Sequence, residues 1–223
     1  VKTAAESVAP VRGTLVYLKD GGTGDGSSAA RAVGTLLDAY EALDLTKDCT
    51  VVICGTFTTP KETYTYPGSF DGSVTFTSVY DGVDYRTSGA QYVFRPYCYG
   101  SACETKFENI NMVSGGTGSN GGVVFVAQHH PFTVGEGVSV TGGDNLTGST
   151  IATSLTIIGG YYTKVGEPKL NDSRDVNITV LSGSKLYILA VNRGIAGTYT
   201  GTANIHIGGS AQVSTVNASA ANI

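Results

Sequence analysis

The chain has 223 residues, a formal net charge of −4, and charged side chains at only 14% of its positions, against roughly a quarter in typical soluble domains. The slight acidic excess argues against nucleic acid or an anionic membrane surface as a main partner, and no apolar run approaches the ~20 residues that span a bilayer. With 31 glycines and no tryptophan, the composition favours an extracellular all-β protein, for which we expect no cofactor.

The first elements in chain order are an extended segment at residues 1–13, a strand at 14–19 and a single amphipathic helix at about 29–43. A glycine-rich loop, Asp20-Gly-Gly-Thr-Gly-Asp-Gly26, joins strand and helix, and the Ser-Ser pair after it can cap the helix. The apolar stripe of the helix consists of Ala30, Val33, Leu36, Leu37 and Tyr40. We expect this helix to cover the first unit of a repeating structure, because a terminal unit otherwise exposes apolar interior and unpaired backbone groups.

A short cassette recurs along the rest of the chain: apolar, usually polar, apolar, then Gly or Ser-Gly in most copies. Its copies start at residues 51, 74, 110, 132, 155, 178 and 205. This spacing, about 22–27 residues with one longer gap, indicates a solenoid. A strand of three to five residues at such a period is typical of one turn of a parallel β-helix. The sequence therefore predicts one β-helix domain at 14–213, followed by an extended tail at 214–223.

The four cysteines form two pairs with the same spacing. Cys49 and Cys54 lie at the two ends of one predicted strand, about 16 Å apart at strand rise, too far to form a disulfide there. Cys98 and Cys103 flank a glycine-containing loop, where a local disulfide and two free thiols both fit the spacing. Zinc is the weaker alternative, because two C-x4-C pairs depart from the usual zinc spacing.

The stretches that carry a family resemblance near the N-terminus are the loop at 20–26, a helix with Ala30, Ala32 and Leu36, and Thr50-Val-Val-Ile-Cys-Gly55. In this order they resemble the entry region of the pectate-lyase-like, right-handed parallel β-helix superfamily. Residues 74–85 and 177–183 look like β-helix modules of bacterial cell-surface proteins. The resemblance covers about residues 14–213 as a pattern. It implies a right-handed parallel β-helix that is secreted or held at the cell surface. The superfamily includes polysaccharide-cleaving enzymes, adhesins and structural fibres, so the fold alone selects no function.

No catalytic set is recognisable in the sequence, and we expect a protein that is not an enzyme. A β-helix hydrolase would need carboxylates within roughly 5–10 Å of each other, and a lyase would need clustered acidic calcium ligands beside a basic residue. Glu104, Glu108 and Glu136 are scattered, so only the fold could bring such acids together.

Four aspartates directly precede glycine, which is typical of turns: Asp20, Asp25, Asp71 and Asp81. Asp20 and Asp25 are weak calcium candidates within the glycine-rich loop. The simpler interpretation is that Asp25 caps the start of the helix.

The three histidines are better explained as surface or turn residues than as metal ligands or catalytic residues. His129 and His130 precede Pro131, which favours a surface loop or a corner between strands. His206 lies between Ile205 and Ile207 and should point outward.

Tyrosines crowd residues 64–99 and could bind sugars or a protein partner, or could simply cover the strand surface. They are Tyr64, Tyr66, Tyr80, Tyr85, Tyr92, Tyr97 and Tyr99.

The two ends of the chain suggest assembly. Both are low in charge and lack a helical pattern, and little follows the last cassette that could cover it. An uncovered strand edge is a template for pairing with another copy. The candidate assembly residues are Val1, Val8, Val11, Ile205, Ile207, Val213, Val216 and Ile223. The sequence thus predicts a structural subunit that stacks head-to-tail on copies of itself in a surface filament, layer or adhesive fibre. The alternatives are a carbohydrate-active β-helix enzyme and a carbohydrate-binding adhesin module.

Overall fold

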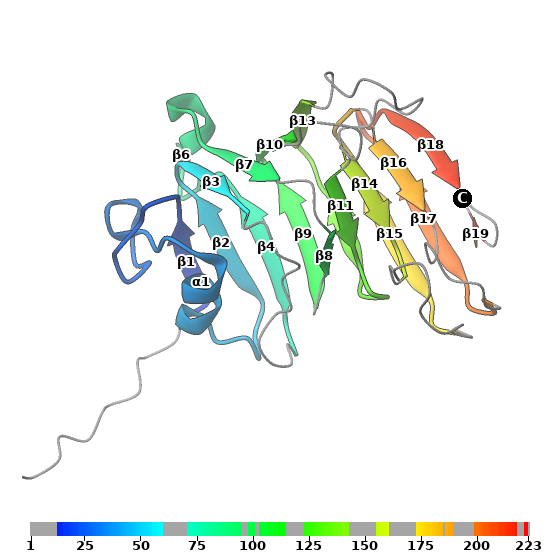
Figure 1. Ribbon diagram of the computed structural model, residues 1–223, viewed down its shortest axis with the longest axis horizontal. Coiled ribbons are helices and arrows are strands. Elements are labelled where there is room, and N and C mark those ends of the chain that lie inside the picture. Colours follow the sequence, from blue (N-terminus) through cyan, green and yellow to red (C-terminus); the bar gives the residue numbers. More distant parts are fainter. Residues whose placement is uncertain are drawn as a thin grey trace, which may run out of the picture.

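The computed structural model describes residues 13–59, 71–94, 98–100, 103–114, 123–142, 155–160, 173–184, 186–189, 199–217 and 221–222. These residues are mostly β-strand with one α-helix, and nearly all the strands belong to three parallel sheets (Figure 1). The predicted all-β class is confirmed.

The largest sheet has eight strands that run parallel to one another. Their order across the sheet is β1 (Leu15–Leu18), β2 (Cys49–Ile53), β4 (Ser73–Thr77), β9 (Glu104–Glu108), β12 (Phe132–Val134), β15 (Val176–Val180), β17 (Ala203–Ile207) and β19 (Ala221–Asn222). Because this order follows the chain, each strand lies beside the strand of the same sheet that comes before it in the sequence.

Two smaller parallel sheets complete the set. The four-stranded sheet contains β13 (Ser139–Gly142), β10 (Asn111–Ser114), β7 (Gln91–Phe94) and β3 (Thr56–Thr58). The five-stranded sheet contains β18 (Val213–Asn217), β16 (Leu186–Leu189), β14 (Leu155–Ile158), β11 (Val123–Val126) and β8 (Cys98–Gly100).

From β7 onward the chain visits the three sheets in turn. Between β7 and β15 it passes three times through the four-stranded, five-stranded and eight-stranded sheets, always in that order. From β16 to β19 it alternates between the five-stranded and eight-stranded sheets. All seven predicted cassettes overlap strands, but two of them, at 110 and 155, belong to the smaller sheets rather than to the large one. Some successive cassettes are therefore adjacent strands of the large sheet, whereas others lie in different sheets. The spacing between cassettes is not the length of one repeat throughout the chain.

The core lies between the three sheets and is rich in aromatic rings. Phe76 and Phe107, neighbours on β4 and β9, stack with ring centroids 4.9 Å apart. Phe107 also meets Tyr92 of the four-stranded sheet and Phe125 of the five-stranded sheet edge-to-face, at 5.6 and 5.7 Å. All four side chains are buried. The prediction that Tyr92 lies on the surface is wrong, because its alternating position on β7 points inward.

The helix is shorter than the sequence predicts. A 3-10 turn, η1 (Ala29–Arg31), is followed by extended residues, and only then by α1 (Leu36–Ala42). Val33 forms bridges with Leu18 and Thr23, so the chain is strand-like just where the predicted helix would continue. Thr35 is the N-cap, and its hydroxyl oxygen accepts the Asp38 amide at 3.1 Å.

The expected apolar stripe is therefore only partly buried. Leu36 and Tyr40 face the core and Val33 is buried outside the helix, whereas Ala30 and Leu37 are exposed. None of the described helices is long and apolar enough to cross a membrane.

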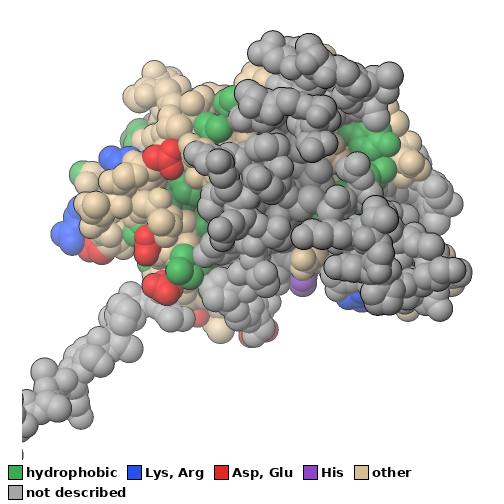
Figure 2. Space-filling view, viewed as in Figure 1, with side chains coloured by type: hydrophobic (Ala, Val, Ile, Leu, Met, Phe, Trp, Pro, Cys, Tyr) green, Lys and Arg blue, Asp and Glu red, His purple; other side chains and the backbone are tan. Residues whose placement is uncertain are grey.

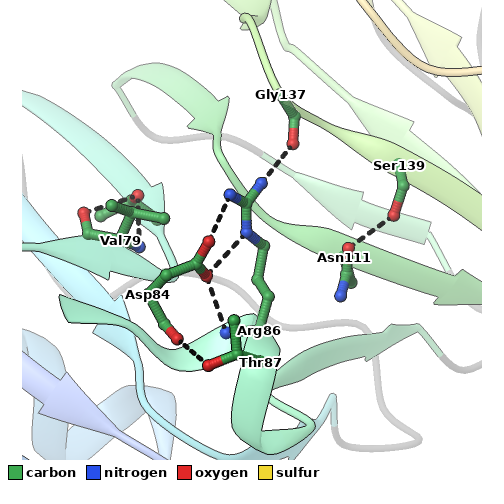
Figure 3. Close-up of polar contacts among 8 residues, drawn as sticks. Val79, Asp84, Arg86, Thr87, Asn111, Gly137 and Ser139 are labelled. Atoms are coloured by element: carbon green, nitrogen blue, oxygen red, sulfur yellow. Dashed lines mark hydrogen bonds and ion pairs between the residues drawn. The ribbon is translucent and has the colours of Figure 1, made fainter.

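A small insertion sits between β4 and β7. It contains the antiparallel hairpin β5 (Val79–Tyr80) and β6 (Val83–Asp84), followed by the 3-10 turn η2 (Tyr85–Ser88). The Asp84 carboxylate caps η2 by accepting the Arg86 amide, and it also accepts two bonds from the Arg86 guanidinium (Figure 3). At the other end of the chain, β18 continues to Asn217, past the domain boundary expected at residue 213.

Candidate functional site

The N-terminal end of the sheets is closed by the chain itself. On the outer edge of β1, the Tyr17 amide donates to the Gly26 carbonyl at 2.9 Å, and the Tyr17 carbonyl accepts the Val33 amide at 2.9 Å. Gly13 exchanges two further bonds with the residues that end and follow α1, at 3.1 and 2.7 Å. Gly24 comes so close to this segment that a Cβ there would lie 2.1 Å from the Arg31 carbonyl oxygen. These contacts occupy backbone groups that another strand would need.

Side chains seal the same end. Leu36, Ala39, Tyr40 and Leu43 are buried in one cluster with the β1 core side chains, and α1 lies beside β1 at this end of the sheets (Figure 1). In the described residues the helical segment thus packs over the end of the sheets at β1, and the helix itself supplies only part of this cover.

At the opposite end of the described sheets, which we call the open end, core positions are less covered. Three aliphatic side chains on β17 and β18 occupy inward positions of the sheets but are only partly covered: Ile207 is 37% exposed, and Val213 and Val216 are half-buried. Their register partners one strand earlier are Val180, Leu186 and Ile188, each 0% exposed. The same kind of position is thus less covered at this end of the described sheets, where β18 is the last strand of the five-stranded sheet and β19 pairs only with Ala203 and Asn204 of β17.

The open end also lacks the charges that usually protect an exposed strand edge. Residues 199–217 contain no Asp, Glu, Lys or Arg. On the face shown in Figure 2, the charged side chains of the described residues gather mainly toward the N-terminal end. One protective feature is present: the pairing of β16 with β18 shifts register beside Leu186, which leaves Ser214 as the extra residue of a bulge. Thr215–Asn217 pair regularly beyond it.

The structure brings together three of the predicted assembly residues, Ile207, Val213 and Val216, at this end. Ile205 is 5% exposed and belongs to the core, so it supports the end from within rather than presenting a surface. Val1, Val8, Val11 and Ile223 lie outside the described residues.

Two of the tyrosine candidates lie together with a third ring that the sequence did not point to. Tyr80 and Tyr85 both pack edge-to-face against Tyr17 of β1, with centroids 6.3 and 6.2 Å away. Burial, and then the neighbouring Tyr85, raise the pKa of Tyr17. Val52, the register partner of Tyr17 on β2, faces away from the core yet is 0% exposed. Edge-to-face packing accounts for the clustering of these three rings, and sugar binding by them stays a prediction. Tyr64, Tyr66, Tyr97 and the side chain of Tyr99 lie outside the described residues.

The calcium candidates bind separate protein partners. Asp20 accepts the amide and hydroxyl of Thr58 at 3.0 and 2.8 Å. Asp25 accepts the amide and hydroxyl of Ser27 and the Arg31 guanidinium, and the Ser27 bonds are the main cause of its lowered pKa. Asp25 thus organises the turn before η1, close to the capping role expected for it. Within the described ranges, no three His, Cys, Asp or Glu side chains gather as metal ligands would. Calcium binding here stays a prediction.

The described cysteines are buried or half-buried free thiols. Cys103 is free and joins the core cluster, so the structure does not form the Cys98–Cys103 disulfide; the Cys98 side chain lies outside the described residues. The disulfide is not formed because the Cys103 side chain, which immediately precedes β9, points into the core. Burial raises its pKa to about 11 and also raises those of Cys49 and Cys54.

On β4, the strand positions beside the acids of β9 carry hydroxyl side chains: Ser73 lies beside Glu104 and Thr77 beside Glu108. Glu108 pairs with Lys106 on its own strand at 2.5 Å. The positions beside Lys106 are Thr75 on β4 and Thr133 on β12. A pair of carboxylates across adjacent strands, as a hydrolase would need, is not formed at these positions.

The histidines lie where the sequence predicted. His129 and His130 are in the turn between β11 and β12, where His129 adopts a φ of 67° and its ring lies against Tyr199 at 6.4 Å. Burial, the neighbouring His129 and Arg174 lower the pKa of His130. His206 on β17 is exposed, as expected.

Comparisons with protein-family models, with curated proteins and with solved structures found no match to this chain. The resemblance to the pectate-lyase-like superfamily therefore remains a prediction from the sequence pattern.

Proposed function

We propose that this chain is an extracellular structural subunit, built as a right-handed parallel β-helix, whose copies stack head-to-tail in a surface filament, layer or adhesive fibre. The solenoid interpretation is supported by three parallel sheets that the chain visits in turn and whose strands follow chain order. The cell-surface location rests on the low charge and on the family resemblance.

The observation that carries the assembly is the difference between the two ends. One end has its backbone groups bonded and its core sealed, while the other leaves Ile207, Val213 and Val216 partly uncovered. Covering apolar surface is favourable by about 25 cal/mol per Å², and a free strand edge supplies hydrogen bonds to whatever covers it. A contact between two different surfaces of the same chain repeats without closing, which generates a fibre.

The test is a pair of matched lysine substitutions followed by light scattering across a concentration series and electron microscopy. Ile207→Lys places a charge at the open end, whereas Val83→Lys places one on β6, at the side of the stack, where the native side chain is 47% exposed. We expect the unsubstituted chain and Val83→Lys to form elongated assemblies and Ile207→Lys to stay monomeric, with all three equally folded by circular dichroism. A chain that stays monomeric at every concentration would contradict the proposal. Depolymerisation of an acidic polysaccharide by the purified chain would point instead to the enzyme.

A further inference from the structure

We propose that Tyr17 of β1 and Tyr85 of η2 form the site of an oxidative crosslink, a carbon–carbon bond between the two phenol rings, which pins the insertion after β4 to the first strand of the large sheet. The two ring centroids lie 6.2 Å apart, and the ring planes meet at 80°. The crosslink lies within one chain and needs no second copy, so it goes beyond the proposed function and does not depend on it. Its co-reactant is hydrogen peroxide, used by a peroxidase.

Strand register brings the two rings together although they are far apart in the sequence. Tyr17, Val52 and Thr77 are register partners on β1, β2 and β4, on the face that points away from the core. The insertion begins directly after Thr77, whose hydroxyl oxygen accepts the Val79 amide at 3.1 Å. From there it returns across two inter-strand steps, roughly 10 Å, and brings Tyr85 against Tyr17.

Both rings project from backbones that are held on two sides. Tyr17 is bonded through its amide and its carbonyl to the segment between β1 and α1, each at 2.9 Å. The Tyr85 amide donates to the Ser78 carbonyl at 2.9 Å, and the Tyr85 carbonyl accepts the Ala90 amide at 3.0 Å. Holding two reacting groups side by side replaces a bimolecular encounter with an intramolecular one. Coupling between these two rings is therefore favoured over coupling with another molecule.

The two hydroxyl groups are placed as the crosslinked product requires. In that product the new bond joins the ring carbons next to the hydroxyls, so the two hydroxyls flank the bond. Burial, and then contact with Tyr85 that includes a side-chain hydrogen bond, raise the pKa of Tyr17. This hydrogen bond keeps the hydroxyls close, and the edge-to-face contact places the edge of one ring against the other.

Tyr80 is the competing partner for Tyr17. Its ring centroid lies 6.3 Å from that of Tyr17, almost as close as Tyr85. However, Tyr80 is 37% exposed and belongs to a strand of only two residues. The side-chain hydrogen bond that acts on Tyr17 comes from Tyr85. The site therefore contains a matched control, a second tyrosine in contact with the same ring.

The reaction balances with hydrogen peroxide as the oxidant. A peroxidase removes one electron and one proton from each phenol, and one molecule of hydrogen peroxide is reduced to two molecules of water. The two tyrosyl radicals then couple through the ring carbons next to their oxygens. The hydrogen on each of these carbons moves to the oxygen of its own ring, which restores both phenols. The chain loses two hydrogen atoms in total.

The crosslink closes a covalent loop from residue 17 to residue 85 that includes β2 and β4. A covalent link between distant positions stabilises a fold mainly by restricting the unfolded chain. We therefore expect the oxidised protein to unfold at a higher urea concentration than the untreated protein.

The test oxidises the full chain with hydrogen peroxide and a peroxidase, in an equal mixture of unlabelled and heavy-isotope-labelled protein. Mass spectrometry of the digested product should find the peptides of Tyr17 and Tyr85 joined, with the loss of two hydrogen atoms, and only in pairs that carry the same label. This result does not depend on whether copies assemble, so it is separate from the test of the proposed function. Joined peptides with mixed labels, or no crosslink at Tyr17, would overturn the proposal.

Three variants that replace one tyrosine by phenylalanine keep each ring and remove one hydroxyl. Tyr17→Phe and Tyr85→Phe should reduce the yield of the crosslinked pair at least tenfold, whereas Tyr80→Phe should crosslink like the unsubstituted chain. Oxidation should also fail to raise the urea midpoint of Tyr85→Phe. If Tyr85→Phe kept the yield by coupling Tyr17 to Tyr80, the assignment of Tyr85 would be wrong. An equal rise in the urea midpoint of Tyr85→Phe and the unsubstituted chain would show that this crosslink does not pin the insertion.

Discussion

Arg86 donates a hydrogen bond from its guanidinium to the carbonyl oxygen of Gly137, fifty-one residues further along the chain, over 3.0 Å (Figure 3). The same guanidinium holds both carboxylate oxygens of Asp84, at 2.9 and 2.7 Å. One side chain thus ties the insertion after β4 to the turn between β12 and β13, joining two segments that no strand pairing connects.

We predict that Arg86→Ala lowers the free energy of unfolding by about 1 kcal/mol, because a charge-assisted pair and a long-range bond are lost together. Arg86→Lys should recover only part of this, since lysine cannot make the two-pronged contact. Urea denaturation gives both values. Arg31→Ala is the control: its pair with Asp25 is more exposed and purely local, so we expect a smaller loss. An equal loss in both variants would show that the link to Gly137 contributes nothing.

The same cluster predicts an acid dependence. The hydrogen bonds from Arg86 lower the pKa of Asp84 below its ordinary value. Asp84 therefore contributes stability that is present above the unfolded-state pKa near 4 and is lost as pH falls through the folded value. The difference in urea midpoint between Arg86→Ala and the unsubstituted chain should shrink below pH 4. A constant difference from pH 7 to pH 2 would contradict this.

Ser182 bonds to the turn that precedes β13, the last strand in the order of the four-stranded sheet. Its buried hydroxyl oxygen accepts the Val138 amide at 2.8 Å, and the hydroxyl donates to the Gly135 carbonyl at 2.5 Å. We predict that Ser182→Ala costs about 1–3 kcal/mol, because it leaves a buried amide unsatisfied. Ser184→Ala, which removes a 3.4 Å bond at a half-buried site, should cost under about 0.5 kcal/mol. Thermal unfolding of the two variants side by side checks this ordering.

Phe107 is the ring that joins all three sheets, and it is 0% exposed. Phe107→Ala should cost about 3–5 kcal/mol, since the surrounding rings cannot collapse into the cavity. Phe107→Leu should cost clearly less. The exposed Tyr80→Ala serves as the control for losing an aromatic ring at the surface, and guanidinium denaturation measures all three. Similar values for Phe107→Ala and Tyr80→Ala would contradict the central role of Phe107.

The Cys103 thiol predicts an alkaline loss of stability. Burial raises its pKa from 9.0 to about 11. A raised pKa in the folded state means that this contribution is complete below about pH 9 and declines as pH rises from 9 toward 11. Subtracting the urea midpoints of Cys103→Ala from those of the unsubstituted chain isolates it from tyrosine and lysine titration. At neutral pH the native thiol should resist alkylation until the protein is unfolded. Rapid native alkylation of Cys103 would show that it is not buried.

Much of the fold could be predicted because strand patterns are local. The alternation in Val176–Val180 puts Val176, Ile178 and Val180 on one face, and the structure buries all three. The helix was harder, since Val33 and Leu36 are spaced as on a helix but Val33 bridges to Leu18 instead. Tertiary pairing prevailed over local propensity at that point.

The candidate site was less predictable for a related reason. The tyrosines near residue 80 stood out by their number, yet their partner Tyr17 lies more than sixty positions earlier, and nothing local links them. For Cys103, the spacing allowed both a disulfide with Cys98 and a free thiol, whereas the inward direction of its side chain placed it in the core.

The sequence alone determined that this chain alternates short strands with turns, and which face of most strands is apolar, because both follow from side chains two residues apart. Only the tertiary structure decided which sheet each strand joins, which edge of the stack is bonded by the chain itself, and which is left open. Those outcomes depend on pairing between residues far apart in sequence: Tyr17 bonds at its edge to Gly26 and Val33, whereas no described strand pairs with the far edge of β18, the strand that carries Val216.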